Sequence, residues 1–283
     1  MQTSELTISR NREHYDHEYA QVNADILVAK VRRLKTFFDD ATKTDTSWHG
    51  FYHGGFADRI AKKRVLELGC GNGLNALVMA SFGADVVAND LSHETERILS
   101  EAASKLQIEN LQVLVGDFAT LRFEPRSFDF VVGKAFLHHL THELEDLYLA
   151  KAARLLKPTG EARFCEPAVN SPFLDKLRWM TPVPGRPSML NRRKFLKYQE
   201  QDPHPERDNS SEHFRRVGEK FFFDVGIVPI GSLERFGRIM PQGDFNRRFR
   251  RCAHRVEARL PMWFRSKAAR SQLIAFGRPR PSA

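Results

Sequence analysis

The sequence predicts an α/β fold with a doubly wound, mostly parallel sheet, and three observations support this class. Residues 64–68 form a short apolar run that ends in a turn with alternating glycines and continues into a helical pattern from Leu74. Further apolar runs recur at residues 85–90, 111–115, 128–132 and 161–165. Acidic, basic or histidine side chains come where these runs end. Parallel strands buried on both faces read as continuous apolar runs, and open α/β sheets bind ligands at the carboxyl ends of their strands.

The turn after the first strand is the strongest motif of the chain. Glu67 precedes the alternating glycines Gly69, Gly71 and Gly73. Glycine lacks a Cβ, so the backbone of such a turn can approach a ligand closely while its N–H groups point outward. The turn therefore predicts a nucleotide-like cofactor at the carboxyl end of the sheet.

The ends of the later strands carry groups that suit such a cofactor. Asp90 ends the second strand, one βαβ step after the glycine turn, where a carboxylate can accept hydrogen bonds from both ribose hydroxyls. The next strands end at Asp117-Phe118, at Gly133-Lys134 with His138-His139 shortly after, and at Glu166. These polar groups are thus expected at the edge of the sheet where a ligand binds.

Together these motifs resemble the class I S-adenosylmethionine-dependent methyltransferases, of the small-molecule kind called type 11. The resemblance covers residues 61–167, and its hallmark is the acid followed by three alternating glycines, joined to Asp90, Asp117 and the His-His segment. It implies a Rossmann-like sheet of seven strands with a terminal antiparallel pair. That pair would be residues 225–230 and 271–276.

The resemblance also implies how the matched residues would hold S-adenosyl-L-methionine. Glu67 would orient the glycine turn or the ammonium group, while the turn passes under the methionine part. Asp90 would hold the ribose, and Asp117 would meet the adenine amino group with Leu91 and Phe118 beside the ring. The implied cofactor-binding residues are Glu67, Gly69, Cys70, Gly71, Gly73, Asp90, Leu91, Asp117, Phe118 and Lys134.

Methyl transfer from a sulfonium requires alignment of the acceptor and exclusion of water, and a hydroxyl acceptor also requires a base. His138 and His139 are the candidate catalytic residues, because an imidazole titrates near neutral pH and both follow the fourth strand. Adjacent helical residues point about 100° apart, so we expect only one of the two to face the pocket. An amine acceptor with a free lone pair needs no base. The candidate acceptor contacts are Tyr15, Tyr19, Glu166 and Trp179.

The chain divides into four parts. Residues 1–55 keep an approximate helical spacing of apolar side chains, which predicts a long helix that serves as a lid. Residues 56–170 form the expected S-adenosylmethionine-binding core. Residues 171–208 are rich in proline, which disfavours regular structure and predicts a shaped substrate region with one short helix. Residues 209–283 hold the end of the sheet and a basic amphipathic helix near 244–264.

Positive charge is concentrated at the C-terminal end. The 283 residues carry 44 Lys and Arg against 35 Asp and Glu, and residues 235–283 hold 13 of the former and 2 of the latter. Between 244 and 264, apolar side chains recur at steps of three and four while arginines occupy other faces. Such a helix either packs its apolar face on the core or contacts anionic lipid headgroups or a lipid-linked acceptor.

Several classes of site and partner are disfavoured. The three cysteines stand far apart, which predicts a reducing compartment without a disulfide framework. We expect no metal site: His138, His139 and His142 form the only dense cluster of candidate ligands in the sequence, and adjacent histidines diverge, although His138 and His142 are four apart. Residues 133–136 lack the (Asn/Asp)-Pro-Pro-aromatic segment of enzymes that methylate DNA bases, which argues against nucleic acid. Without a visible signal or spanning segment, we expect a cytoplasmic protein, with peripheral contact at the inner face of the membrane.

Alternatives remain open for the function and for one residue. An NAD-dependent oxidoreductase would have the last glycine of Gly-x-Gly-x-x-Gly where Leu74 stands, which argues against that class. A non-catalytic nucleoside-binding module of the same fold is the other alternative. Lys134 either binds the cofactor or an acidic acceptor, or it faces solvent. The acceptor is a small molecule or lipid-linked, methylated at oxygen or nitrogen.

Overall fold

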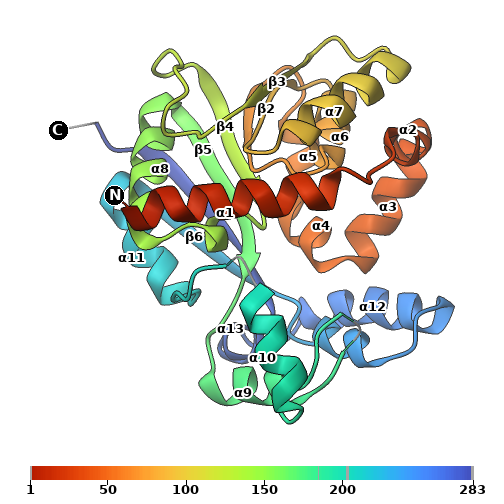
Figure 1. The fold of residues 1–283 in the computed structure, drawn as a ribbon. Coiled ribbons are helices and arrows are strands. Elements are labelled where there is room, and N and C mark those ends of the chain that lie inside the picture. The colour runs from red at the N-terminus through yellow and green to blue at the C-terminus, as the bar shows by residue number, and fades with distance from the viewer. Residues whose placement is uncertain (1, 184, 202–203, 282–283) are drawn as a thin grey trace.

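The computed structural model describes residues 2–183, 185–201 and 204–281. A seven-stranded sheet forms its centre, with the strand order β3-β2-β1-β4-β5-β7-β6 (Figure 1). The strands are β1 (Arg64–Leu68), β2 (Asp85–Asp90), β3 (Leu111–Val115), β4 (Phe128–Lys134), β5 (Leu156–Pro167), β6 (Phe222–Ile230) and β7 (Ser271–Pro279). β1 to β5 are parallel, and β7 pairs antiparallel with both β5 and β6. The predicted mostly parallel sheet with a terminal antiparallel pair is confirmed.

The sheet is buried on both faces, which explains why its strands are continuous apolar runs. In β1, Val65 belongs to one hydrophobic cluster and its neighbour Leu66 to another. Successive side chains of a strand point to opposite faces, so the two clusters lie on opposite sides of the sheet. The helices of the first face include α6 (Leu74–Ser81) and α7 (His93–Leu106), and those of the second include α8 (His142–Leu155) and α11 (Ser211–Phe221).

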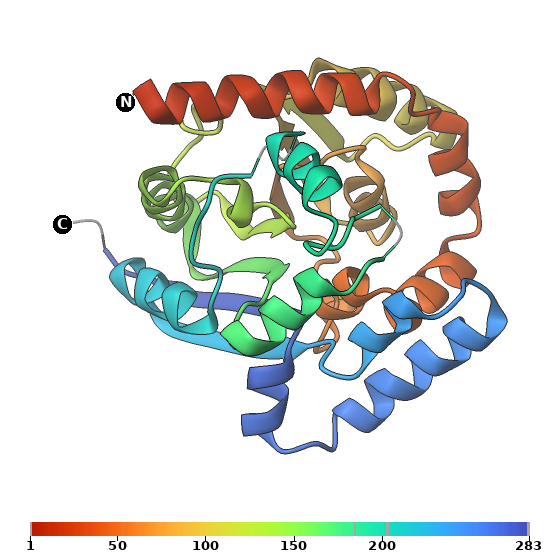
Figure 2. The ribbon, with the colours of Figure 1, turned by 60° about the horizontal axis from the view of Figure 1, so that its bottom comes forward.

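The N-terminal segment is broken into short helices, so the prediction of one long helix is wrong. These helices are α1 (Gln2–Tyr19), α2 (Ala24–Arg32), α3 (Leu34–Thr44), α4 (Thr46–Phe51) and α5 (Phe56–Arg59). Asn23 and Asp45 cause two of the breaks, because each side chain caps the next helix by accepting a backbone N–H. α1 crosses the sheet (Figure 1, Figure 2), and the carboxylate of Asp16 accepts hydrogen bonds from Ser92 Oγ (2.6 Å) and His93 N (3.1 Å). These bonds attach α1 to the start of α7.

The remaining helices gather below the sheet in the view of Figure 1. They are α9 (Pro172–Met180), α10 (Arg192–Gln201), the short 3₁₀ helix η2 (Glu234–Ile239), α12 (Asp244–Glu257) and α13 (Met262–Ala268). α10 was not predicted, and it forms in a proline-free part of the otherwise proline-rich segment, of which Pro184 and Pro203 lie outside the described residues. The basic helix expected near 244–264 is two helices, because Pro261 has no N–H with which to continue α12.

α12 buries a polar face rather than its apolar one. Asn246, His254 and Glu257 are buried on it, and the helix packs against η2 and α3. By contrast, Phe245 and Val256 of the apolar stripe are 74% and 40% exposed. Of the alternatives left open by the sequence, packing of the apolar side of this helix on the core is therefore wrong. In the described part of the chain, no helix combines the length and the apolar content needed to cross a bilayer.

Candidate active site

A cavity of about 420 Å³ lies at the carboxyl ends of β1, β2 and β4, beneath α1. Its volume is within the range of small-molecule sites, about 300–1,000 Å³. One face of α1 lines it with Thr7, Ile8, Asn11, Tyr15, Glu18 and Tyr19. The predicted site residues that line it from the core are Glu67, Gly69, Cys70, Gly71, Asp90, Leu91, Phe118, Lys134 and His139.

Other predicted site residues lie outside this lining. The described residues that line the cavity do not include Gly73, Asp117, His138, Glu166 and Trp179. Their surroundings, described below, show what each one contacts instead.

The three glycines of the turn adopt left-handed backbone conformations, with φ of 59°, 61° and 77° at Gly69, Gly71 and Gly73. Each has a different neighbour. A Cβ on Gly69 would lie 2.3 Å from the Phe136 ring, and one on Gly73 would lie 2.3 Å from the Leu99 side chain. Gly73 therefore permits helix packing inside the core, whereas Gly71 faces the cavity.

Asp90 joins the glycine turn to the end of β2. One carboxylate oxygen accepts the backbone N–H of Gly71 at 2.8 Å, and the other accepts that of Ser92 at 3.0 Å. The side chain is almost completely buried, and this burial raises the pKa of Asp90 to about 6. Each carboxylate oxygen has a second lone pair, so Asp90 can accept two further hydrogen bonds from a ligand.

Glu67 is a second buried carboxylate in the cavity wall. Its Oε1 accepts a hydrogen bond from Asn75 Nδ2 at 2.6 Å, and Asn75 in turn accepts one from the hydroxyl of Tyr52 at 2.9 Å. Oε2 has no hydrogen-bond partner among the described residues. Burial raises the pKa of Glu67 to about 7, although Asn75 and the charge of Lys134 lower it. An unpaired buried oxygen of this kind suits a cationic or hydrogen-bond-donating ligand.

The third strand contributes an aromatic wall rather than a free acid. Asp117 accepts hydrogen bonds from the Tyr148 hydroxyl and from the backbone N–H of Ala119 (2.8 Å). Phe118 and Tyr148 both line the cavity, in an edge-to-face contact with ring centroids 5.2 Å apart. Tyr148 was missed in the sequence analysis, because inside the helical pattern of α8 it is indistinguishable from a core residue.

The two adjacent histidines follow Ala135, whose φ of 57° turns the chain into the short 3₁₀ helix η1 (Leu137–His139), and their ring centroids lie 4.3 Å apart. His139 lines the cavity, and its Nδ1 lies 3.4 Å from the Tyr15 hydroxyl of α1. Burial, together with the charges of nearby histidines, lowers the pKa of His139 well below its ordinary value. The imidazole facing the cavity is therefore neutral at pH 7.

His138 points away from this lining and pairs with Glu166. Its Nδ1 lies 2.7 Å from Glu166 Oε2, and the other oxygen of Glu166 accepts the backbone N–H groups of Phe136 (2.9 Å) and Leu137 (2.8 Å). Glu166 is only 1% exposed. This carboxylate therefore holds η1 in place, and it does not reach the cavity itself.

Aromatic side chains complete the roof and one wall. Tyr15 and Tyr19 stack with their ring centroids 5.3 Å apart, and burial raises the pKa of Tyr19. Trp48 of α4 also lines the cavity, and Lys134 Nζ lies 5.4 Å from its ring centroid. Trp179 instead packs in the α9–α10 region, with its ring centroid 5.4 Å from that of Phe195.

The sheet order and the glycine-turn cavity define a class I methyltransferase domain. Comparison with known families agrees, because residues 65–160 match the family described as methyltransferase domain. This match covers about a third of the chain and agrees with the family that the sequence motifs resemble.

Curated relatives match about a third of the chain. A ubiquinone biosynthesis O-methyltransferase of Xanthomonas campestris pv. campestris is 37% identical over 99 residues, which is 34% of this chain and 40% of the relative. The cypemycin N-terminal methyltransferase of a Streptomyces species is 35% identical over 102 residues, covering 35% of this chain and 40% of the relative. The chain thus spans less than half the length of these relatives.

Two solved structures share the fold over most of the chain. A chain from the complex between the Haloferax volcanii Trm112 methyltransferase activator and a methyltransferase aligns with a TM-score of 0.57 and 18% identity, covering 96% of this chain and 99% of that one. Phosphoethanolamine N-methyltransferase 2 of Haemonchus contortus, in complex with S-adenosyl-L-methionine, aligns with a TM-score of 0.53 and 17% identity, covering 92% and 60%. At such identities the likeness establishes the fold alone.

Proposed function

We propose that this protein transfers the methyl group of S-adenosyl-L-methionine to an oxygen or nitrogen of a small-molecule or lipid-linked acceptor. The observation that carries the proposal is the pairing of Gly71 with Asp90 in the wall of a cavity that α1 covers. This pairing puts a left-handed glycine and a carboxylate side by side at the carboxyl ends of two parallel strands. Such strand ends are where α/β sheets bind nucleotides.

The residues present fit this cofactor. The second lone pairs of Asp90 can accept both ribose hydroxyls, and Oε2 of Glu67 can pair with the ammonium of the methionine part. Phe118 offers a ring edge or face to the adenine. Carboxylates in the wall favour a cofactor with sulfonium and ammonium charges over an anionic pyrophosphate. Lys134 can pair with the carboxylate of the methionine part.

For methyl transfer from this cofactor, the protein mainly has to align the acceptor with the methyl group. S-adenosyl-L-methionine supplies an activated methyl group on a positively charged sulfur. α1 closes the cavity over the reacting atoms and excludes water, while Tyr15 and His139 lie where they can orient the acceptor. Of the two adjacent histidines, His139 is the one that can reach an acceptor.

His139 is the proposed base for a hydroxyl acceptor. Its imidazole faces the cavity and lies beside the Tyr15 hydroxyl, so a tyrosine–histidine pair adjoins the acceptor end of the cavity. His138 and Glu166 act indirectly, because their contact fixes the short 3₁₀ helix that carries His139. For an amine with a free lone pair the same histidine would orient the acceptor without removing a proton.

The relatives support an acceptor of either kind. One is named for O-methylation in ubiquinone biosynthesis and the other for methylation of the N-terminus of cypemycin. Each match covers about a third of this chain and less than half of the relative. The proposal therefore includes both oxygen and nitrogen as the atom that is methylated.

Calorimetry on the purified protein tests the cofactor assignment. We expect heat of binding with S-adenosyl-L-methionine and with S-adenosyl-L-homocysteine, and none with NAD. Incubation with cell extract and cofactor labelled at the methyl group should then give a labelled product. NAD binding in place of the sulfonium nucleoside would instead favour an oxidoreductase. Cofactor binding without any labelled product would favour the non-catalytic module.

We also propose that the outer surface of α12 and α13 contacts an anionic membrane, where a lipid-linked acceptor would reside. Phe245 and Trp263 on this surface are 74% and 68% exposed. Arg248, Arg255 and Arg259 are exposed there without an ion pair among the described residues. Exposed aromatic and basic side chains on one amphipathic surface suit the boundary between headgroups and acyl chains, and each basic residue near it contributes about 1 kcal/mol.

Vesicle flotation tests this surface. At low salt we expect the protein to float with phosphatidylglycerol vesicles and to remain below with phosphatidylcholine vesicles. The double variant Phe245→Ser/Trp263→Ser should lose flotation, whereas Phe223→Ser, which removes an exposed aromatic of β6, should keep it. Absence of the intact protein from the anionic vesicle fraction at low salt would contradict the proposal.

A further inference from the structure

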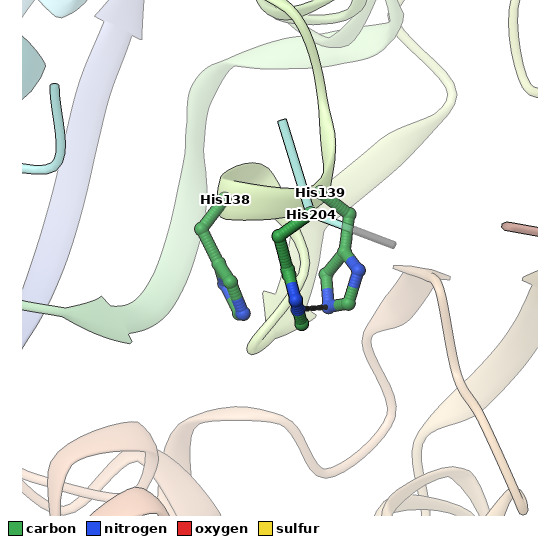
Figure 3. Close-up of side chains that lie close together, drawn as sticks. All are labelled: His138, His139 and His204. Carbon is green, nitrogen blue, oxygen red and sulfur yellow. Dashed lines mark hydrogen bonds between the residues drawn. The ribbon is translucent and has the colours of Figure 1, made fainter. Parts of the chain in front are cut away.

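Three histidines from two distant segments meet beside the cavity. His138 and His139 belong to η1, and His204 follows α10 in the proline-rich segment. One ring nitrogen of each lies within 4.8 Å of the other two. Figure 3 shows the three rings with these nitrogens at the same end, and it marks the contact between His139 Nε2 and His204 Nε2 at 3.3 Å.

The spacing of these nitrogens fits a tetrahedral ion. Zinc binds imidazole nitrogen at about 2.0–2.1 Å, so two ligand nitrogens of a tetrahedral site lie roughly 3.3 Å apart. The observed separation of 3.3 Å between His139 and His204 has this value. The His138 ring stacks on the His204 ring with centroids 4.9 Å apart, and its ring nitrogen lies within 4.8 Å of the other two.

Outer contacts already orient two of the three rings. His138 Nδ1 lies 2.7 Å from the buried carboxylate of Glu166, which leaves its Nε2 for an ion. His139 Nδ1 lies 3.4 Å from the Tyr15 hydroxyl, which leaves its Nε2 on the side of His204. A histidine that ligates a metal through one nitrogen typically donates its other N–H to a carboxylate or another oxygen.

A second cluster in the chain shows the opposite arrangement. His142, Glu145 and His213 also lie within ligand distance of one another. There, however, the buried guanidinium of Arg207 contacts Glu145 Oε1 at 2.8 Å and His213 Nε2 at 3.1 Å. Arginine is always protonated, so its charge satisfies the carboxylate and repels a cation. This cluster is therefore a structural ion pair and provides an internal control.

We propose that His138, His139 and His204 form a binding site for a divalent transition-metal ion of the zinc type. Three imidazoles leave a fourth coordination position, and it opens toward the cavity because His139 lines that cavity. The bound ion would also join the proline-rich segment to the core, since His204 belongs to the former and the other two ligands to the latter.

A bound metal ion and a proton would compete for the same atom, Nε2 of His139. Nε2 of His139 cannot hold a metal ion and accept a proton at the same time, so metal loading would switch off proton removal by this residue. This consequence rests on the proposed methyl transfer, whereas the binding of the ion does not. The test below therefore uses metal binding alone, without cofactor or acceptor.

Zinc titration of tag-free protein against a chromogenic chelator measures the site directly. We expect one zinc per chain in the wild type and a loss of affinity of more than about 100-fold in His204→Ala, since even outer contacts of metal ligands contribute about 10–100-fold. His204 is exposed, so its replacement spares the core. His204→Cys should restore binding, because thiolate is also a zinc ligand.

The matched control is His142→Ala, which removes a histidine from the Arg207 cluster and should leave zinc affinity unchanged. Zinc should also slow proteolysis within residues 171–201 in the wild type and in His142→Ala, but not in His204→Ala. Equal zinc affinity in His204→Ala and the wild type, or no stoichiometric binding in the wild type, would overturn the proposal. Neither result would bear on whether the protein binds S-adenosyl-L-methionine.

Discussion

The cofactor side and the acceptor side of the cavity are built in different ways. The proposed cofactor side comes from one βαβ unit, in which Glu67 and Asp90 lie near the ends of consecutive strands and the backbone N–H of Gly71 donates to the Asp90 carboxylate. The proposed acceptor side brings together Tyr15 and His139, with His204 against His139 outside the lining, and these contacts span 124 and 65 positions of the chain. One side is local in sequence, and the other exists only after the chain has folded.

This difference teaches which changes the two sides tolerate. On the cofactor side, the positive φ angles of the glycines and the burial of both carboxylates constrain every position. On the acceptor side, contacts between rings of separate helices carry the arrangement, so substitutions there can alter specificity without loss of the fold. We therefore expect variants of the acceptor side to change turnover, and variants of the cofactor side to change cofactor affinity.

The largest effect is expected for His139→Gln. With a hydroxyl acceptor, loss of the base should lower kcat by about 10²–10⁴-fold while the Kd for S-adenosyl-L-methionine stays unchanged. Steady-state kinetics and calorimetry measure the two quantities. The control is His142→Gln, whose half-exposed side chain lies outside the cavity lining and should keep full turnover. An unchanged kcat in His139→Gln would show that the acceptor loses no proton to this residue.

Asp90→Asn should have the next largest effect, on cofactor affinity. Hydrogen bonds to a charged group contribute about 1.5–3 kcal/mol each, so the Kd for S-adenosyl-L-methionine should rise by about 100-fold. Asp85→Asn removes the acid at the exposed start of the same strand and should leave the Kd unchanged. An equal Kd in the wild type, Asp90→Asn and Asp85→Asn would show that Asp90 does not bind the cofactor.

The pH dependence of binding follows from the two buried carboxylates. Only ionised Asp90 and Glu67 attract a cationic cofactor, and their pKa values are raised to about 6 and about 7 by burial. Calorimetry should therefore show affinity that falls as the pH drops below these values, by about tenfold at pH 5 for Asp90 alone. Asp90→Asn should show a shallower profile, and a flat wild-type profile would contradict the assignment.

Stability without cofactor should change in the opposite direction. A carboxyl group whose pKa is raised by folding binds its proton more tightly in the folded state. Its contribution is complete below the unfolded pKa, near 4, and is lost as the pH rises through about 6 to 7. The free energy of unfolding of the cofactor-free protein should thus fall between pH 4 and 7, and urea titrations at each pH measure it.

Much of the fold could be predicted from the sequence because local sequence patterns determine its strands and the turn after the first strand. Apolar runs marked the central strands, and the glycine turn marked the start of α6 at Leu74. The single long helix expected near the N-terminus failed because Asn23 and Asp45 are strong capping residues whose effect outweighs the apolar spacing. The outward apolar face of α12 could not be predicted, since spacing alone does not say which face finds a partner.

The candidate site divides in the same manner. Glu67, Gly71 and Asp90 could be assigned to the cavity from their order along the chain. The contacts of His139 with Tyr15 and His204 could not, because nothing in local spacing indicates that a helix near residue 15 and a loop near residue 204 approach the fourth strand. Local ligand spacing likewise could not indicate the proposed histidine site, because its candidate ligands come from distant segments.

The smallest effect is expected for Trp179→Ala, which tests the boundary of the acceptor side. Trp179 was predicted to contact the acceptor, but its ring packs against Phe195 and beneath the guanidinium groups of Arg178 and Arg186, each 4.9 Å from its centroid. Its truncation should loosen the α9–α10 region and change the acceptor KM by less than about threefold. A larger rise in KM with unchanged kcat would show that the α9–α10 region reaches the acceptor, and the acceptor side would then extend beyond the cavity beneath α1.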